Sequence, residues 1–315
     1  MRKTLPTAAD ADGGPQGPPP SDGVPGELLA GRELLAWRRR CLASGGRAAD
    51  LDWLLDLAGG LPWPTLQRVH LDPTKQVQLT RQRSALEALW RCHLETSKPL
   101  QYLVGRCPWR DLELQVAPGV LIPRQETELL VELARDRLAC PPARWADLGT
   151  GSGCLAIALA RLWPGVQGLA VDLSPLALAQ AERNLQAAGV GEQVQLIQGS
   201  WWQPLRSSWG RLELVVANPP YIPTAVWAGL ESGVREHEPV LALDGGADGL
   251  EAIRQVVAGA AQGLAPGGWL LLEHHHDQSP AVQELLTLAG LVETSAHRDL
   301  EGTWRFASAR RGRRE

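Results

Sequence analysis

The chain lacks several features that would place it in whole classes of protein. Its five cysteines are odd in number and form no C-x-x-C pair, which argues against a disulfide framework and a structural zinc site. No apolar stretch approaches the length of a membrane span, and residues 1–25 have no hydrophobic core of a signal peptide. The net charge of −4 disfavours a broad nucleic-acid footprint. We therefore expect a cytoplasmic protein with no membrane contact and no stable nucleic-acid partner.

The composition that is present suits a globular protein with more than one domain. With 315 residues, of which 44% are hydrophobic, the chain can bury a full core and has room for a domain beside a nucleotide-binding one. Residues 1–25 are rich in proline, glycine, alanine and aspartate, so we expect a disordered tail. Residues 26–97 carry apolar residues at helical spacing, with the longest stripe over residues 76–96, and predict a small all-helical domain.

Beyond this helical part the pattern changes. Between Tyr102 and Ile122 apolar residues alternate with polar ones before a Pro-Gly turn, which predicts a hairpin that links two domains. From Glu126 onward, helices and strands follow one another in turn, which is typical of a doubly wound α/β domain. The expected strands begin at Trp145 and cover 166–171, 194–197, 212–217 and 269–273, and a closing hairpin is expected within 292–309. The expected helices cover 126–138, 154–162, 175–189, 250–264 and 280–289.

The tetrapeptide Asn218-Pro219-Pro220-Tyr221 follows an apolar run and predicts a site that holds a planar amino group. The two prolines have no N–H, so the backbone offers carbonyl acceptors on a stiff turn, and Asn218 adds a side-chain carbonyl. Such acceptors can bind the coplanar N–H donors of an amide or exocyclic amine, while the Tyr221 ring lies against its flat face. Taken alone, the tetrapeptide also fits an ordinary turn, because Asn-Pro is common in turns.

A glycine-rich turn upstream predicts a nucleotide-like cofactor. Gly149, Gly151 and Gly153 stand in the run Asp-Leu-Gly-Thr-Gly-Ser-Gly, between an expected strand and an expected helix. Asp172 lies 19 residues past Gly153, where a βαβ unit brings it within reach of a ribose diol. A dinucleotide site shares these features, but the spacing is G-x-G-x-G and no second nucleotide-binding half follows. Together with Asn-Pro-Pro-Tyr, the pattern predicts an S-adenosylmethionine methyltransferase that acts on planar nitrogen.

Five segments make the chain similar to the peptide chain release factor glutamine methyltransferases, the PrmC/HemK family, over roughly residues 26–311. The segments are Pro99–Gly105, Leu121–Glu128, Asp147–Gly153, Asn218–Tyr221, and His237–Pro239 with Asp248–Leu250. The resemblance implies a Rossmann-like, seven-stranded class I methyltransferase domain at residues 124–311. It also implies a hairpin linker at residues 101–123 and a helical domain at residues 26–100, to which we assign recognition of the substrate.

The resemblance further implies which residues bind cofactor and substrate. The residues expected to contact S-adenosyl-L-methionine are Gly149, Thr150, Gly151, Ser152, Gly153, Asp172, Trp201 and Asn218. Asn218, Pro219, Pro220 and Tyr221 are expected to hold the substrate, and Asn218, Pro219 and Tyr221 to serve in catalysis. The implied substrate is the glutamine in the Gly-Gly-Gln motif of class I peptide chain release factors, whose side-chain amide nitrogen receives the methyl group. Ser200 departs from the family pattern, which commonly has an acid there, so the adenine contact on that side is less defined.

Methyl transfer to an amide depends mainly on the position of the amide nitrogen relative to the methyl donor. An amide nitrogen is a poor nucleophile because its lone pair is delocalised into the carbonyl, whereas a sulfonium methyl donor is already activated. As the nitrogen attacks, it gains positive charge, so the carbonyls of Asn218 and Pro219 accept stronger hydrogen bonds in the transition state than in the ground state. The departing proton becomes acidic only after transfer begins, so we expect no side-chain base.

Three other functions fit parts of the pattern. A glutamine methyltransferase of a ribosomal protein would share every catalytic residue, and only the helical domain would distinguish it. A nucleic-acid amino methyltransferase would use Asn-Pro-Pro-Tyr on a base, but it would need a recognition domain or a basic channel that residues 26–97 do not suggest. A non-catalytic binding module would show a broken cofactor loop, and this loop is intact.

Two expectations concern metals and assembly. His274, His275 and His276 resemble a metal-binding tract, but consecutive residues at a strand end point to alternating faces, so one ion could hardly bind all three. We therefore expect no metal site. We also expect the protein to act as a monomer, with class I release factors as its partners.

Overall fold

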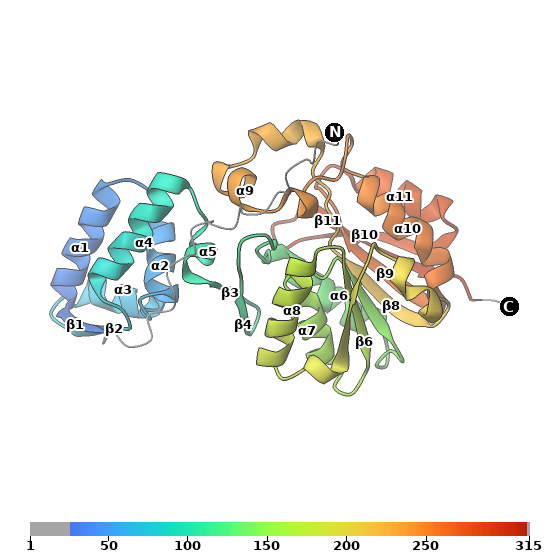
Figure 1. The fold of residues 1–315 in the computed structure, drawn as a ribbon, viewed down its shortest axis with the longest axis horizontal. Coiled ribbons are helices and arrows are strands. Elements are labelled where there is room, and N and C mark those ends of the chain that lie inside the picture. Colours follow the sequence, from blue (N-terminus) through green and yellow to red (C-terminus); the bar gives the residue numbers. More distant parts are fainter. Residues whose placement is uncertain (1–25, 314–315) are drawn as a thin grey trace, which may run out of the picture. The chain divides into compact units, whose positions relative to one another are not determined.

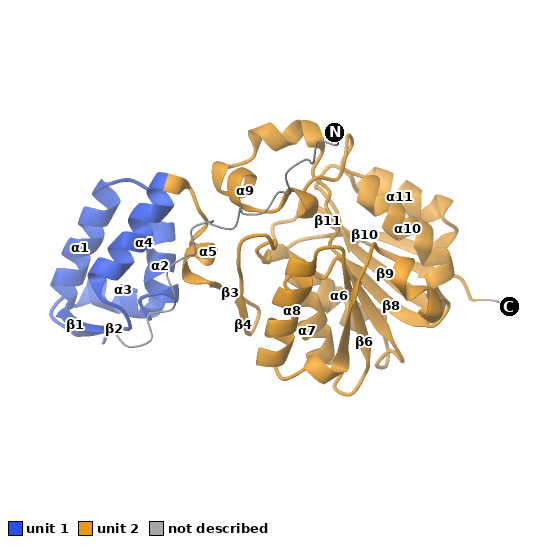
Figure 2. Ribbon diagram, in the orientation of Figure 1, with its two compact units in different colours: residues 1–95 blue, residues 96–315 orange. Residues whose placement is uncertain are grey.

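The structure of the chain, a computed structural model, describes residues 26–313 (Figure 1). These residues divide into two compact units, with the boundary between Glu95 and Thr96 (Figure 2). The expected disordered tail, residues 1–25, lies outside the described residues. Within residues 26–313, every helix is too short or too polar to cross a bilayer.

The first unit packs four helices around one apolar core. The helices are α1 (Gly31–Ala43), α2 (Ala48–Leu57), α3 (Trp63–Leu71) and α4 (Arg83–Thr96), of which the last reaches the unit boundary. Apolar residues three and four positions apart lie on one face of each helix and are buried there. The core residues are Leu34, Trp37, Leu51, Leu54, Leu55, Leu66, Leu86 and Trp90.

The prediction of a helix over residues 76–96 is wrong for its first part, and the unit is not entirely helical. Residues Gln76–Leu79 form strand β2, which pairs antiparallel with β1 (Glu27–Ala30). The sequence Gln-Val-Gln-Leu alternates exposed and buried residues, so it has the period of a strand rather than that of a helix. The helix begins at Arg83, whose N–H and guanidinium both donate to the Glu27 carboxylate at the start of β1.

The linker begins with a helix before the predicted hairpin. The short helix α5 (Leu100–Val104) includes Tyr102, which the alternating pattern had placed in the hairpin. The hairpin itself consists of β3 (Arg106–Trp109) and β4 (Leu112–Gln115), which pair antiparallel. The Tyr102 hydroxyl donates to the Val120 carbonyl at a distance of 2.6 Å, so its ring is held inward by the segment that follows the hairpin.

The second unit contains a seven-stranded sheet, as predicted. The strand order is β10-β11-β9-β8-β5-β6-β7. Each pair of neighbouring strands from β9 to β7 in this order is parallel. The final two strands close the sheet as an antiparallel hairpin. The strands are β5 (Trp145–Leu148), β6 (Gly168–Asp172), β7 (Val194–Gln198), β8 (Leu212–Ala217), β9 (Leu264–Glu273), β10 (Leu291–Arg298) and β11 (Trp304–Arg311).

Helices cover both faces of this sheet, which confirms the doubly wound α/β class (Figure 1). One face packs against α6 (Leu129–Arg137), α7 (Cys154–Leu162) and α8 (Pro175–Ala187), and the other against α10 (Glu251–Gly263) and α11 (Ser279–Leu288). Ser174 caps α8, because its hydroxyl oxygen accepts from the N–H of Ala177. A short helix, α9 (Ser232–His237), and two 3-10 turns lie in the long segment between β8 and α10.

Candidate active site

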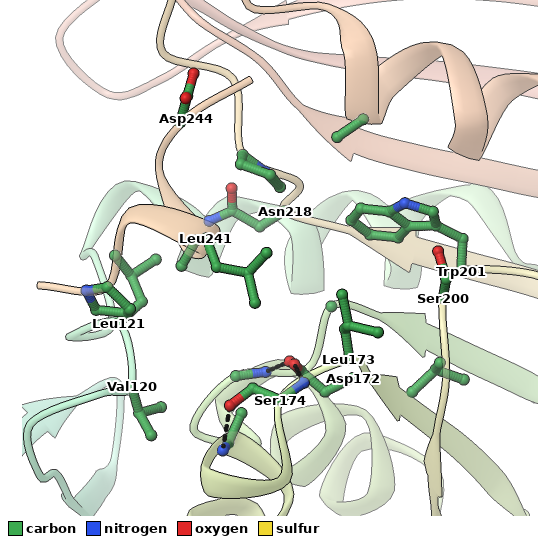
Figure 3. A pocket seen from close by; sticks show the side chains of 18 of the residues that line it. Val120, Leu121, Asp172, Leu173, Ser174, Ser200, Trp201, Asn218, Leu241 and Asp244 are labelled. Carbon is green, nitrogen blue, oxygen red and sulfur yellow. Dashed lines mark hydrogen bonds between the residues drawn. The ribbon is translucent and has the colours of Figure 1, made fainter. Parts of the chain in front are cut away.

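A cavity of about 350 Å³ lies where the parallel strands end (Figure 3). Its walls come from the loops that follow β5, β6, β7 and β8, and from segments around Val120, Leu241 and Ala252. Ligands of open α/β sheets bind in this crevice, outside the carboxyl ends of the strands. In Figure 3, Asn218 lies in the middle of the view between Leu241 and Trp201, and Asp172 lies below it.

The loop after β5 exposes its backbone to the cavity. Gly149 (φ 79°) and Gly151 (φ 57°) both adopt the left-handed conformation that favours glycine. A Cβ on Gly151 would meet no atom within 4 Å, so a ligand can approach the backbone closely there. A Cβ on Gly149 would lie 3.3 Å from the ring of Trp201, which shows that this ring packs over the loop.

Asp172, the last residue of β6, joins the glycine loop to the next helix. One carboxylate oxygen accepts from the N–H of Gly151 and the other from the N–H of Ser174, each at 2.8 Å. Burial raises the pKa of Asp172, and these two N–H groups oppose that rise by stabilising the charge. Since each oxygen has a second lone pair, the carboxylate can still accept from two hydroxyl groups of a ligand.

Trp201 and Ser200 line the cavity beyond β7. Trp201 has a positive φ of 47°, a conformation that costs energy for a residue with a side chain. This backbone turns the Trp201 ring to the cavity side, while Trp202 is buried on the other side and donates to the Val256 carbonyl at 2.7 Å. The result is a flat apolar surface beside the glycine loop, which suits an aromatic ring of a ligand.

Asn218 directly follows β8 and is oriented by a hydrogen bond across the sheet edge. Its amide nitrogen donates to the Thr127 hydroxyl oxygen at 3.0 Å, and that hydroxyl donates to one oxygen of Glu273 at 2.7 Å. Within residues 26–313, no protein group donates to the side-chain oxygen of Asn218 or to the carbonyl of Pro219. Of these two acceptors, the side-chain oxygen of Asn218 belongs to a residue that lines the cavity, whereas Pro219 is buried.

Glu273, the last residue of β9, is almost completely buried at 1% exposure. The register pairs Leu272 with Ala217, so the strand ends at Glu273 and Asn218 are neighbours. The second oxygen of Glu273 accepts from the Tyr221 hydroxyl at 2.8 Å. Burial raises the pKa of Glu273, whereas the bonds from Thr127 and Tyr221 and the charge of Arg305 favour the carboxylate. Burial also raises the pKa of Tyr221, so this phenol keeps its proton.

The remaining expected site residues, apart from Pro220, lie outside the cavity lining. The residues Thr150, Ser152, Gly153, Pro219 and Tyr221 are not among the lining residues, whereas Pro220 is. The Thr150 hydroxyl donates to Asp147 at 2.7 Å, and the Ser152 carbonyl accepts from Asn184 at 2.8 Å. These residues shape the loop and the turn from behind. Burial raises the pKa of Asp147 to about 7.

An ion pair joins two of the cavity walls. Glu238, just ahead of the lining residue Pro239, is 1% exposed in its side chain and pairs with Arg124 at 2.6 Å. Its other oxygen accepts from the N–H of Ile122 at 3.1 Å. The segment that includes Leu121 is thereby held against the segment that includes Pro239.

The lining carries negative charge, which fits a cationic ligand. Asp172, Asp244 and Glu251 all border the cavity, and the described lining contains no lysine or arginine. Combined with an exposed glycine backbone and an apolar ring surface, these carboxylates suit a molecule that has an aromatic base, a ribose and a positive charge. S-adenosylmethionine has all three, so the residues present fit this cofactor.

One group of possible metal ligands lies outside this cavity lining. In the part of the chain that the structure describes, His275, His276 and Asp277 have ligand atoms within 4.8 Å of one another. His274 is buried and does not belong to the group, so the three histidines do not form one site. The expected alternation is wrong for His275 and His276, which lie in the same group because β9 has ended at Glu273 and the chain turns there. The His275 ring is hydrogen-bonded to the Asp277 carboxylate at 2.6 Å.

Sequence reasoning assigned no role to Thr127 or Glu273, although both contact the Asn-Pro-Pro-Tyr turn. Thr127 lies in the segment Leu121–Glu128 that resembles the family. The resemblance therefore includes this residue but assigns no role to its hydroxyl. Glu273 ends a nearly continuous apolar strand, and an acid at such a place is a signal for a buried functional group.

Comparisons with known proteins agree with this geometry. Residues 125–227 match the family model described as methyltransferase small domain. The release factor glutamine methyltransferase of Prochlorococcus marinus is 48% identical over 287 residues, covering 90% of this chain and 98% of that protein. The protein of the same name from Geobacter sulfurreducens is 38% identical, covering 91% and 98%. Among solved structures, the catalytic domain of hMettl16 in complex with a MAT2A 3′UTR hairpin has a TM-score of 0.54 at 14% identity, covering 74% of this chain and 82% of that one. At that identity the likeness concerns the fold alone.

Proposed function

The chain belongs to the release factor glutamine methyltransferases, and on that premise we propose that it methylates the glutamine of the Gly-Gly-Gln motif in class I peptide chain release factors. It is a methyltransferase whose cofactor is S-adenosyl-L-methionine. The observation that carries the proposal is the turn at Asn218, where neither the side-chain carbonyl nor the Pro219 carbonyl has a donor among residues 26–313. Two such acceptors match the two N–H donors of a glutamine amide.

We assign the cofactor to the wall formed by the glycine loop, Asp172 and Trp201. The Asp172 carboxylate would accept from the ribose hydroxyls, Trp201 would lie against the adenine, and Gly149 and Gly151 would let the backbone approach the methionine part. The residues Thr150, Ser152 and Gly153 support this loop from behind. When bound, the cofactor supplies a methyl group activated by its sulfonium.

The substrate amide is held by Asn218 and Pro219 in this proposal. Their carbonyl oxygens accept from its nitrogen, and these bonds strengthen as the nitrogen becomes positive in the transition state. Tyr221 and Pro220 fix the turn, since the prolines restrict φ and the Tyr221 hydroxyl is held by Glu273. The proton leaves to water after methyl transfer begins, so no residue is required as a base.

The test is methylation of defined proteins with labelled S-adenosylmethionine. We expect label on the Gly-Gly-Gln glutamine of a purified release factor after peptide mapping. A release factor with asparagine at that position is the control and should remain unlabelled. Bulk ribosomes are the second substrate, and label on a ribosomal-protein glutamine in place of the release factor would overturn the proposal.

We further propose that residues 26–95 recognise the release factor and take no part in the chemistry. A single glutamine side chain offers too little contact to be selected among the many in a cell, so specificity has to come from a remote surface. Arg39 and Arg40 of α1 are exposed and suit this role, whereas Arg38 is engaged with Asp52 at 2.6 Å.

Removal of this unit separates recognition from cofactor binding. A chain that begins at Thr96 should bind S-adenosylmethionine almost normally and lose most of its activity on intact release factor. Circular dichroism controls for folding. Activity at the full-length rate in the folded, shortened chain would contradict the division of labour.

A further inference from the structure

The side-chain amide of Asn218 can face the cavity in two ways, and only one of them serves the proposed reaction. With the oxygen toward the substrate, Asn218 accepts from the glutamine amide. With the nitrogen toward it, two NH₂ groups would face each other and no hydrogen bond would form. Something in the protein must therefore choose between two orientations of nearly identical shape.

The contacts behind Asn218 make this choice. The Thr127 hydroxyl has a single proton and touches two partners, an oxygen of Glu273 at 2.7 Å and the Asn218 amide at 3.0 Å. An ionised carboxylate has no proton to give, so Thr127 must donate to Glu273. Its oxygen can then only accept, and of the two ends of the Asn218 amide only the nitrogen can donate.

Burial raises the pKa of Glu273, and the groups that contact it oppose this rise and favour the acceptor-only form that this argument needs. Both of its oxygens receive a hydroxyl proton, one from Thr127 and one from Tyr221. The Arg305 guanidinium on the neighbouring strand adds a positive charge that favours the carboxylate, and Glu126 opposes it. The two hydroxyl donors leave each oxygen of the buried carboxylate with a hydrogen bond.

We propose that Glu273 is a positioning residue that, through Thr127, sets which end of the Asn218 amide faces the substrate. This inference rests on the proposed function, because it explains why the acceptor end is presented. Glu273 itself touches no substrate. It determines which group donates and which accepts in each hydrogen bond of the chain from Asn218 through Thr127 to Glu273.

The direction of this chain can be reversed on purpose. In Glu273→Gln, the introduced amide oxygen can still accept from Tyr221 while its NH₂ donates to Thr127, so Thr127 then donates to Asn218 and attracts the amide oxygen of that residue. In Asn218→Asp, two carboxylates compete for one Thr127 proton. In the double variant, the introduced amide at position 273 donates to Thr127, and Thr127 donates to the introduced carboxylate at position 218. Every group is then satisfied, and an oxygen again faces the cavity.

The experiment is a double-mutant cycle on release factor methylation. We expect each single variant to lose roughly 100-fold in kcat, the scale for one preorganised hydrogen-bonding group, with cofactor affinity within about threefold of the unaltered protein. The double variant should exceed Asn218→Asp by at least about tenfold, since the coupling between the two sites restores the chain. Thr127→Val should resemble Glu273→Gln, while Thr127→Ser, which keeps the hydroxyl, should lose less. Glu213→Gln, a carboxylate that accepts from the N–H of Ala143 at the opposite edge of the sheet, is the matched control.

A second readout does not depend on methylation. With labelled protein, a nuclear Overhauser contact between the Asn218 amide protons and the Thr127 methyl group should be present in the unaltered chain and absent in Glu273→Gln. If the unaltered protein shows this contact but no methylation of release factor, the proposed function fails and the orientation stands. A Glu273→Gln variant with the contact and the rate unchanged would overturn the inference, because a protonated Glu273 would then already behave like glutamine. A double variant no faster than Asn218→Asp would overturn it as well.

Discussion

The cavity has two halves that are held in place by different kinds of contact. The glycine-loop half, formed by Gly149, Gly151 and Asp172, is held by backbone N–H groups that donate to one carboxylate. The Asn218 half consists of Asn218 in the lining together with Thr127 and Glu273, which lie outside the lining, and it is held by side chains that bond to one another. In the first half a substitution changes the shape of a loop, whereas in the second it changes which groups donate and which accept.

The difference suits the two ligands. The cofactor has hydroxyl groups, an aromatic base and a charge spread over a large surface. Many weak contacts, including close approach to the backbone, are therefore enough to bind it. The glutamine amide is small and has to be held with its nitrogen in one position for attack. We therefore expect variants of the glycine-loop half to act on affinity and variants of the Asn218 half to act on rate.

The largest effect is expected for Asn218→Ala. It removes an acceptor that is aimed at the charge developing on the nitrogen, so turnover should fall by on the order of 100- to 1000-fold. Single-turnover methylation of release factor measures this loss, and calorimetry checks that cofactor affinity is largely retained. Near-normal turnover would show that the two halves do not divide binding and rate in this way.

The next effect is expected for Asp172→Ala, and it falls on affinity. The variant removes bonds from a charged acceptor to the ribose, so cofactor binding should weaken roughly 10- to 100-fold. It also releases the N–H groups of Gly151 and Ser174, and the loop loses its support. Calorimetry with S-adenosylmethionine is the measurement, and Asp136→Asn, an exposed acid on α6, is the control. Unchanged affinity would mean that the acid serves the loop alone.

A smaller effect on affinity is expected for Trp201→Ala. The ring offers a flat surface next to the glycine loop, and loss of one aromatic contact costs about 1 kcal/mol, or roughly fivefold in affinity. Quenching of tryptophan fluorescence by the cofactor should diminish in the same variant. An equal loss of turnover at saturating cofactor would place Trp201 with the Asn218 half instead.

The smallest effect on methyl transfer is expected for Asp147→Asn, which acts on stability. Burial raises the pKa of Asp147 to about 7, so the folded chain holds a proton that the unfolded chain releases near pH 4. The stabilisation that this protonated group contributes to the folded state is therefore complete below about pH 4. It decreases as the pH rises to about 7, by up to about 1.4 kcal/mol per pH unit. Asparagine cannot titrate, so the variant should show a flatter pH dependence in urea unfolding. If the free energy of unfolding depends on pH in the same way in the variant and the unaltered protein, the raised pKa of Asp147 is contradicted.

Much of the fold could be predicted because its signals are local. The helix at Cys154–Leu162 and the strand at Leu212–Ala217 occur as predicted, since an apolar pattern and flanking glycines or prolines define their ends. The failure at residues 76–79 has the same origin. Four residues of alternating pattern were too short to be distinguished from the helical stripe that follows, and it was the pairing with Glu27–Ala30 that made them a strand.

The sequence by itself determined the glycine-loop half, because its parts lie within one βαβ unit. Gly151 and Asp172 are 21 positions apart, and the topology of that unit brings any such pair together. The Asn218 half was decided only by the tertiary structure. Thr127 is 91 positions from Asn218 and 146 positions from Glu273, and no local pattern relates them. They meet because β8 and β9 run side by side and a 3-10 turn from residues 126–128 packs across their ends. The physical reason is that a hydrogen bond between side chains needs two groups within about 3 Å, and over such separations only the packed core supplies that accuracy.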